Sequence, residues 1–429
     1  MALEGAQLKA GIVITGTEVI TARIVDRNGP WLSEELRGRG FDVVHITICR
    51  DRPEDIRAQL DFMAAQGVSL ICTTGGLGPT ADDLTAAIVG EFCEREMFLD
   101  EELLAKINKI IERFASRMNW DQDALDAGSR KQAMVPRGAD ILGPAGTAPG
   151  LVVTPPQGVD KPTVVVLPGP PGELQAIWKE AVETQAFKDL EARTVVYEEQ
   201  MIRMIGIPES DIAKTLRDFD AEVGLGDLEI TTCLRKGEME ILVSHRPEDH
   251  DLRDRLIAVF SEQYADNIFS EDGETVDQQI IRLLDGRKLA LAESCTGGLL
   301  AERLTETPGS STYFMGSAVT YSNEAKAKVL SVDPETLATV GAVSAETAEQ
   351  MAQGAMEAFD ADFTVSVTGI AGPEGGSEEK PVGTVYFHAL ARDGGERALH
   401  LVLPGRRRDV QERAATVALH LVRSLLVEG

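Results

Sequence analysis

The sequence predicts an α/β protein of three domains, with an α/β domain at each end and a small α+β domain between them. Three observations support this prediction. The 429 residues exceed what one hydrophobic core usually organises. The first part of the chain alternates strand-like and helix-like patterns, and this texture changes near residue 195. We expect the domains to span residues 1–185, 186–270 and 271–429.

In the first domain, short apolar runs alternate with amphipathic helical patterns. We expect strands at 10–14, 42–48, 69–73 and 163–167, and helices near 31–36 and 53–64. Elements that alternate in this way favour a parallel sheet with helices on both faces, which is a three-layer arrangement.

The middle domain is expected to contain a β-hairpin with one solvated face. Apolar residues alternate with polar ones from Leu228 to Leu234, and the pattern resumes from Met239 to Val243. Lys236 and Gly237 between them are typical of a tight turn. Residues 270–274 (SEDGE) are the predicted linker to the last domain.

Composition restricts the classes of partner. A formal net charge of −28 argues against binding to nucleic acid or to anionic lipid. No apolar run reaches bilayer length, and the N-terminus lacks a basic segment followed by a hydrophobic one. The five cysteines have no CxxC spacing, so neither a disulfide framework nor a zinc cluster is predicted. We expect a cytoplasmic protein whose partners are small molecules or other proteins.

The segment from Ala292 to Lys326 carries the groups needed to hydrolyse an amide. It contains two serine-bearing glycine turns, a tyrosine and a lysine. A strand from Leu289, a loop over residues 293–298 and a helix from Leu299 are predicted. Such a loop offers backbone N–H groups and a positive dipole end to a phosphate or a developing oxyanion. Alternatively, Ser294 and Thr296 only cap the helix.

A second glycine-rich motif, residues 74–85 (TGGLGPTADDLT), follows a predicted strand of the first domain. Its glycines would let the backbone approach a phosphate, and its paired carboxylates would hold a divalent cation. The expected phosphate-binding residues are Gly75, Gly76 and Gly78, and the expected metal ligands are Asp51, Asp82 and Asp83. The alternative is a structural turn whose acids interact with a helix dipole.

Taken together, these motifs resemble those of the competence/damage-inducible (CinA) family. Residues 75–85, 146–150 (GTAPG) and 167–171 (LPGPP) are similar to the molybdopterin-binding-like domain that opens such proteins. Residues 292–298, 309–311, 321–326, 341–344, 368–373 and 380–384 are similar to the family's nicotinamide mononucleotide deamidase domain. The order and combination of these motifs make the resemblance specific.

The resemblance implies deamidation of nicotinamide mononucleotide in pyridine-nucleotide salvage, without a cofactor. The implied catalytic residues are Ser294, Ser311, Tyr321, Lys326 and Arg407. Ser311 is our preferred nucleophile, and Lys326 would act as base if burial and the helix that Ser322 begins lower its pKa. Otherwise Lys326 lies on a solvated helix face.

Four further residues of the last domain are candidates for substrate binding. They are Thr296, Gly297, Gly369 and Gly372. The last two belong to residues 368–376 (TGIAGPEGG), which would cradle a phosphate or serve as a plain glycine-rich connection. Ser344 is predicted to cap a helix.

For the first domain, the resemblance implies an ADP-ribose pyrophosphatase that depends on Mg²⁺, Mn²⁺ or Co²⁺, or a molybdopterin-binding function. The sequence departs from the family pattern at Ala22 and Gly143, where a glycine and an asparagine are usual, and at Arg406, where an acid is usual. The family also implies a homodimer. The rival hypothesis is a non-catalytic nucleotide- or molybdopterin-binding accessory protein linked to competence and DNA uptake.

Overall fold

The computed structural model describes residues 7–115 and 122–428. The chain divides into two compact units, Met1–Tyr197 and Glu198–Gly429. Within the described residues, no helix combines the length and the apolar character needed to span a bilayer.

The first unit is built on a six-stranded sheet in the order β2-β1-β3-β8-β7-β6. The first four of these strands are parallel, and β7 and β6 continue the sheet in antiparallel fashion. Their bounds are β1 Lys9–Thr15, β2 Asp42–Cys49, β3 Leu70–Thr74, β6 Asp140–Leu142, β7 Gly150–Val153 and β8 Thr163–Leu167. Every residue of β3 and β8 is buried, as expected for parallel strands covered on both faces.

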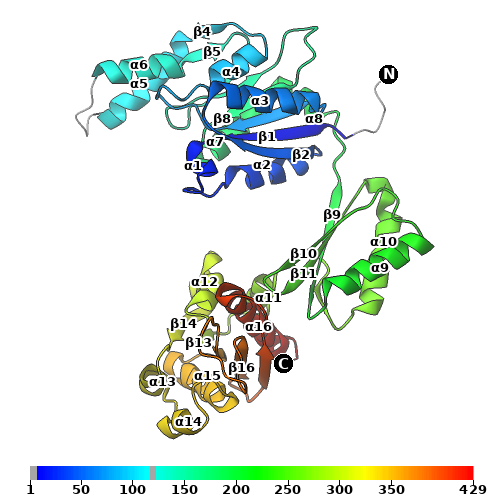
Figure 1. The fold of residues 1–429 in the computed structure, drawn as a ribbon, viewed down its shortest axis with the longest axis vertical. Coiled ribbons are helices and arrows are strands. Elements are labelled where there is room, and N and C mark those ends of the chain that lie inside the picture. Colours follow the sequence, from blue (N-terminus) through cyan, green and yellow to red (C-terminus); the bar gives the residue numbers. More distant parts are fainter. Residues whose placement is uncertain (1–6, 116–121, 429) are drawn as a thin grey trace. The chain divides into compact units, whose positions relative to one another are not determined.

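Helices cover both faces of this sheet, so the expected three-layer arrangement is confirmed (Figure 1). One core lies under α3 (Pro53–Ala65), α4 (Thr85–Phe92) and α5 (Glu101–Ala115). The other lies under α2 (Asn28–Arg37), α7 (Pro171–Ala181) and α8 (Gln185–Glu191). The smaller elements are α1 (Thr17–Ile20), α6 (Gln122–Gln132) and the paired strands β4 (Met97–Leu99) and β5 (Met134–Pro136).

The first unit extends beyond the expected boundary at residue 185. Thr184 caps α8, whose Phe187 is completely buried in the core of the first unit. The Thr194 hydroxyl then donates a hydrogen bond to the carbonyl of Arg39 at 2.7 Å. The apolar side of α8 therefore needs the first sheet for its burial.

The second unit begins with a four-stranded antiparallel sheet in the order β10-β11-β9-β12. Its elements follow the order β-α-β-β-α-β: β9 Glu198–Ile205, α9 Glu209–Glu222, β10 Glu229–Arg235, β11 Glu238–His245, η1 Pro247–Asp249, α10 His250–Gln263 and β12 Ile268–Ser270. The expected hairpin is confirmed as β10 and β11. Its two turn residues, Lys236 (φ 54°) and Gly237 (φ 96°), both have the positive φ that tight hairpins require.

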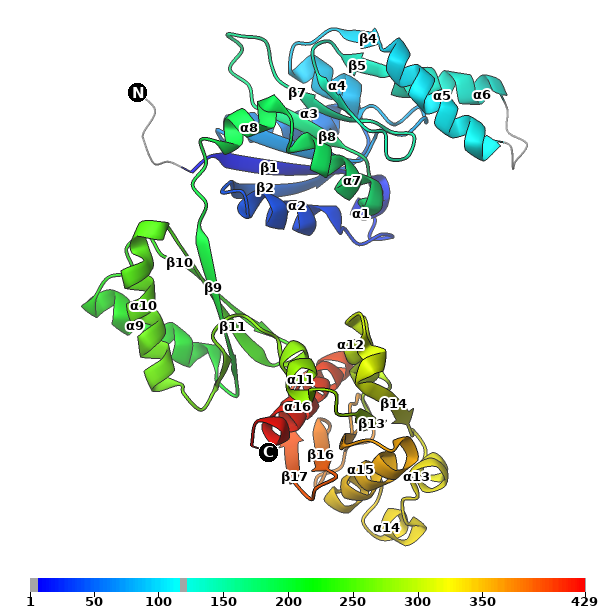
Figure 2. The ribbon, with the colours of Figure 1, turned by 180° about the vertical axis from the view of Figure 1, so that it is seen from behind.

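The remainder of the second unit is a five-stranded sheet in the order β14-β13-β15-β16-β17, of which β14, β13 and β15 are parallel (Figure 2). The strands are β13 Leu289–Glu293, β14 Phe314–Val319, β15 Phe363–Gly369, β16 Thr384–Ala391 and β17 Glu396–Val402. The helical elements are α11 Val276–Leu284, α12 Leu299–Glu306, η2 Ser310–Thr312, α13 Asn323–Leu330, α14 Pro334–Thr339, α15 Ala345–Phe359 and α16 Arg407–Glu428.

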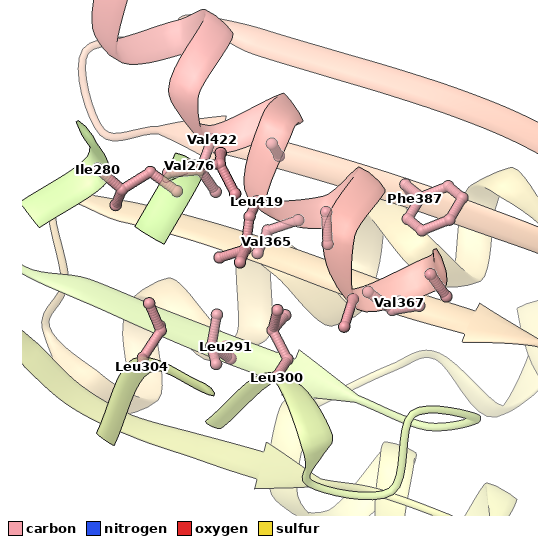
Figure 3. Close-up of a cluster of buried hydrophobic side chains, with 14 of the residues drawn as sticks. Val276, Ile280, Leu291, Leu300, Leu304, Val365, Val367, Phe387, Leu419 and Val422 are labelled. Atoms are coloured by element: carbon pink, nitrogen blue, oxygen red, sulfur yellow. The ribbon is translucent and has the colours of Figure 1, made fainter. Parts of the chain in front are cut away.

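The main core of this sheet lies on the face covered by α11, α12 and α16. Figure 3 shows Leu291 and Val365 from the sheet, Leu300 from α12 and Leu419 from α16 gathered in this cluster. The opposite face packs on α13, α14 and α15 through a smaller cluster that includes Ala292 and Met351. Ser344 caps α15 through the amide of Thr347, as the sequence predicts.

Candidate active site

The candidate site lies at the carboxyl ends of the three parallel strands β14, β13 and β15. Parallel strands end at the same edge of a sheet, so the loops that follow them meet there. The Ser294 amide after β13 donates to the Val367 carbonyl of β15 at 2.9 Å, and the Thr320 amide after β14 donates to the Glu293 carbonyl at 2.8 Å. These hydrogen bonds bring segments together that are far apart in sequence.

A buried lysine contacts a serine hydroxyl at this edge. Ser322 caps α13 through the Ala325 amide, which places Lys326 in the first turn with only 1% of its surface exposed. The Lys326 Nζ donates to Ser294 Oγ at 3.0 Å and to the Thr320 carbonyl at 2.7 Å. Burial lowers the pKa of Lys326 below its ordinary value, because a desolvated ammonium is disfavoured. Lys326 therefore does not lie on a solvated helix face.

Glu293, which the sequence analysis did not single out, fixes the loop that carries Ser294. Its fully buried carboxylate accepts hydrogen bonds from the Thr296 and Ser317 hydroxyls, and from three backbone amides at the start of α12. These amides belong to Gly298, Leu300 and Ala301, at 3.0 to 3.1 Å. An acid directly before a glycine-rich helix start was the available sequence signal.

This arrangement corrects two expectations for the loop. The first amides of α12 are not free for a phosphate, because Glu293 already occupies them. Neither Ser294 nor Thr296 caps the helix, since the capping position is Gly298 and the Thr296 hydroxyl donates to Glu293. The Thr296 amide has no hydrogen-bond acceptor among the described residues. Gly297 (φ 64°) lies between these residues in the left-handed conformation that favours glycine.

Ser311 is not brought to Lys326 in this chain. It is exposed on η2, which precedes β14, whereas the segment from Thr320 to Lys326 follows β14. The carbonyl of its neighbour Thr312 accepts a hydrogen bond from Lys288, at the amino end of β13. Ser311 precedes β14 and Ser294 follows β13. Because a strand of this length spans about 15 Å, the parallel pairing of β13 and β14 places the two serines at opposite ends of these strands.

Tyr321 and Arg407 meet at the site although they are far apart in sequence. The Arg407 guanidinium, at the start of α16, donates to the Tyr321 hydroxyl and to the Gly372 carbonyl, the latter at 2.8 Å. Gly369 ends β15, where an added Cβ would lie 2.6 Å from the Thr384 carbonyl. Gly369 and Gly372 therefore shape the wall of the site on the α16 side.

The glycine motif of the first unit packs closely against its own loop and against the end of β1. A Cβ at Gly75 would lie 2.4 Å from the Thr15 carbonyl, and one at Gly76 would lie 2.2 Å from the Thr85 hydroxyl. A Cβ at Gly78 would lie 2.5 Å from Asp83. These contacts require small residues for a structural reason, whether or not a phosphate binds.

The three expected metal ligands each accept a hydrogen bond from a threonine. Asp51 accepts hydrogen bonds from the amide and the hydroxyl of Thr17. Asp82 and Asp83 each accept a hydrogen bond from the Thr80 hydroxyl. The bond from Thr80 lowers the pKa of Asp82. Among the described residues, no group of three histidine, cysteine or acidic side chains is arranged to hold a metal ion. These carboxylates are thus engaged in shaping turns.

The first unit does contain a pocket of about 650 Å³ at the carboxyl ends of β1 and β3. Asn28, 8% exposed, lies in its wall and donates to the Thr74 hydroxyl at 2.9 Å and the Gly169 carbonyl at 2.7 Å. The Asn28 Oδ1 atom has no partner in the described structure. Arg23 and Arg27 also line the pocket. Sequence analysis missed this site, because Asn28 lies in no glycine-rich motif.

Comparison with known proteins covers nearly the whole chain. The family model described as the CinA C-terminal domain matches residues 273–426, and that of a probable molybdopterin binding domain matches residues 11–188. A CinA-like protein of Mycobacterium avium (strain 104) is 52% identical over 434 residues, covering 98% of this chain and 99% of the relative. A CinA-like protein of Mycobacterium tuberculosis (strain ATCC 25177 / H37Ra) is 50% identical over 423 residues, covering 97% of each.

Solved structures match single regions of the chain. The competence/damage inducible protein CihA from Agrobacterium tumefaciens is 42% identical, with a TM-score of 0.34, and the match covers 35% of this chain and 94% of that one. The protein CinA with unknown function from Thermoplasma acidophilum is 28% identical, with a TM-score of 0.34, and covers 43% and 98% respectively. About half of the residues are identical to those of these relatives over nearly the full length, and both domain models match. The chain therefore belongs to the CinA family.

Proposed function

We propose that the last domain hydrolyses the carboxamide of nicotinamide mononucleotide to give nicotinate mononucleotide and ammonia. The contact of 3.0 Å between the buried Lys326 amine and the Ser294 hydroxyl carries this proposal. A serine hydroxyl is a weak nucleophile by itself and needs an adjacent base. An amine can serve as that base only when it is neutral, and burial moves Lys326 in that direction.

In the proposed reaction, neutral Lys326 accepts the Ser294 proton as Oγ attacks the carboxamide carbon. The Thr296 amide, which has no other acceptor in the described chain, would stabilise the oxyanion that develops. Lys326 then passes its proton to the departing nitrogen, and ammonia leaves behind an ester on Ser294. Water, deprotonated by the same amine, hydrolyses this ester and restores the hydroxyl.

Arg407 is the proposed contact for the nucleotide phosphate. It already lies at the site through its hydrogen bonds to Tyr321 and Gly372. A guanidinium can bind two phosphate oxygens at once, which a neutral side chain cannot. Tyr321, 59% exposed, would hold the guanidinium in place.

The test is ammonia release from nicotinamide mononucleotide by the full-length protein and two serine variants. Ser294→Ala should abolish turnover, because the ester can no longer form. Ser311→Ala is the matched control and should retain most of the wild-type rate if one chain forms the complete site. Turnover by Ser294→Ala at a near-normal rate would refute the assignment of the nucleophile. No ammonia from the wild-type protein would refute the reaction itself.

For the first unit, we propose a nucleotide-binding function, with ADP-ribose pyrophosphatase activity as the candidate reaction. The unpartnered Asn28 Oδ1 needs an N–H or O–H donor. Arg23 and Arg27, which line the pocket together with Glu18 and Asp26, supply guanidinium groups that can pair with a phosphate. ADP-ribose offers an amine, hydroxyls and a pyrophosphate. Asp51, Asp82 and Asp83 stay the candidate ligands of a divalent ion, and no step of this reaction is assigned to that ion.

Two measurements separate the candidate functions of this unit. Calorimetric binding of ADP-ribose that Asn28→Leu weakens at least tenfold would support the pocket. AMP release, measured with and without Mg²⁺, would then distinguish a pyrophosphatase from a binding protein. Binding without AMP, combined with no ammonia from nicotinamide mononucleotide, would favour the non-catalytic accessory function.

A further inference from the structure

A groove of about 510 Å³ lies within the second unit, away from the candidate active site. Its apolar wall is formed by Leu399 and Leu401 of β17, by Val417 and Leu421 of α16, and by Leu234 of β10. Both its volume and its mostly apolar lining fall in the range of small-molecule binding sites. The hairpin turn packs on α16 beside it, where a Cβ at Gly237 would contact Arg413 at 3.4 Å.

The groove leaves large apolar side chains in contact with water. Leu234 is 48% exposed and Leu399 is 37% exposed, although both face the same cavity. Covering such a surface with an apolar ligand is favourable by about 25 cal/mol for each Å² removed from water. The groove therefore favours an occupant with a hydrocarbon portion.

The polar lining of the groove is cationic in an otherwise acidic chain. Lys236 lies exposed in the hairpin turn and has no hydrogen bond or ion pair among the described contacts. Within the part of the chain that the structure describes, Arg413 donates only to the Pro404 carbonyl, at 3.1 Å. No acidic side chain is among the described residues that line the groove. This local excess of positive charge contrasts with the net charge of −28 on the whole chain.

The base of the groove contains a hydrogen-bonded pair of side chains. His420 lines it, and its Nε2 lies 2.7 Å from Glu238 Oε1, where both side chains are nearly buried. The Glu238 carboxylate is thus paired beneath the cavity. Lys236 and Arg413, for which no carboxylate partner is found among the described residues, remain for a ligand.

We propose that this groove binds an amphipathic monocarboxylate of the medium-chain fatty acid class. Its hydrocarbon chain lies against Leu399, Leu401 and Val417, and its carboxylate pairs with Lys236 and Arg413. The proposal does not depend on the function of either candidate site. A cationic or a fully polar ligand would lack one of the two complementary features.

The experiment is isothermal titration of the full-length protein with decanoate, below its micelle concentration. Saturable binding to one site is expected, and hexanoate should bind more weakly by about fourfold for each methylene removed. Decylammonium, which has the same chain length and the opposite charge, should not bind. Absence of saturable decanoate binding, or equally tight binding of decylammonium, would overturn the proposal.

Variants locate the ligand in the groove. Leu399→Asp should weaken decanoate binding at least tenfold, and Lys236→Ala, in an exposed turn, should weaken it about threefold. Val402→Asp is the matched control on the same strand. Val402 is 54% exposed, does not line the groove, and lies on the opposite face of β17 because side chains alternate along a strand. Equal losses in Leu399→Asp and Val402→Asp would contradict the assigned site.

Discussion

Glu293→Gln tests whether the buried carboxylate holds the active-site loop. Glutamine has the same size but supplies one acceptor oxygen instead of two. If that oxygen takes the position of Oε2, the bonds to Thr296, Gly298 and Leu300 persist. The new amino group then faces the Ala301 amide, which in the wild type lies 3.0 Å from Oε1. Two hydrogen-bond donors would thus oppose each other. The Ser317 hydroxyl can rotate to accept instead.

The expected cost is about 3 kcal/mol. One charge-assisted hydrogen bond is worth about 1.5–3 kcal/mol, and an acid at a helix start contributes a further ~0.3–1 kcal/mol. Because unfolding of a multidomain chain is not two-state, hydrogen exchange of the α12 amides is the suitable measurement. A loss of about 3 kcal/mol corresponds to exchange that is on the order of 100-fold faster.

Glu302→Gln provides the control, since Glu302 is an exposed residue of the same helix. It should change the exchange rates by less than about threefold. The rate at which the Glu293→Gln variant deamidates nicotinamide mononucleotide should also fall by about 100-fold, because a shift of the Ser294 loop by an ångström misplaces the nucleophile. Similar exchange rates in the two variants would refute the role assigned to Glu293.

Three further predictions concern the base, the phosphate contact and a strained turn. Lys326→Met should lower kcat by about 10²–10⁴-fold. In the wild type, the lowered pKa of Lys326 should make kcat rise with pH through that pKa, and a flat profile in the ammonia assay would contradict this. Arg407→Gln should reduce kcat/KM for nicotinamide mononucleotide about tenfold or more. The same variant should leave kcat/KM for nicotinamide riboside unchanged, since the riboside lacks the phosphate. Equal losses for the two substrates would contradict a phosphate contact. Ala22, at φ 55°, adopts a left-handed conformation, so Ala22→Gly should stabilise the first unit by about 1 kcal/mol. Urea unfolding followed by tryptophan fluorescence measures this, since all three tryptophans precede residue 198, and a destabilised variant would refute the strain.

The same lowered pKa has a defined effect on stability. Lys326 keeps its ordinary pKa in the unfolded chain and has a lowered pKa in the folded chain. At pH values between these two pKa values, the unfolded state therefore binds more protons than the folded state. The contribution of this residue to stability therefore increases as pH rises through this window. Burial of the amine is thus a stability cost at neutral pH.

Local patterns in the sequence were sufficient for most of the secondary structure. The apolar runs of β3 and β8, the turn at Lys236 and Gly237, and the helix caps Ser322 and Ser344 follow from residues within a few positions of each other. Such features depend on hydrogen bonds and side-chain periodicity inside one segment. The sequence could therefore specify them without knowledge of the other segments.

The end of the first unit was harder to place. The stretch after residue 185 carries a helical pattern of its own, and nothing in that pattern states which sheet buries Phe187. Only the packed structure assigns it to the first core. The hydrogen-bond partners of Asp51 and Asp83 also came only from the structure, because they are threonines brought close by the turns. The metal site itself stays a prediction.

By itself, the sequence determined the family, the alternation of elements and the segment that holds the reactive groups. It did not determine which serine meets the lysine. That choice depends on the parallel register of β13 and β14, which places Ser294 and Lys326 at one edge of the sheet and Ser311 at the other. Nor could it reveal that Glu293 occupies the helix amides. Contacts of this kind are fixed by how distant segments pack, since the same residues in another register would point to opposite ends or faces of the sheet.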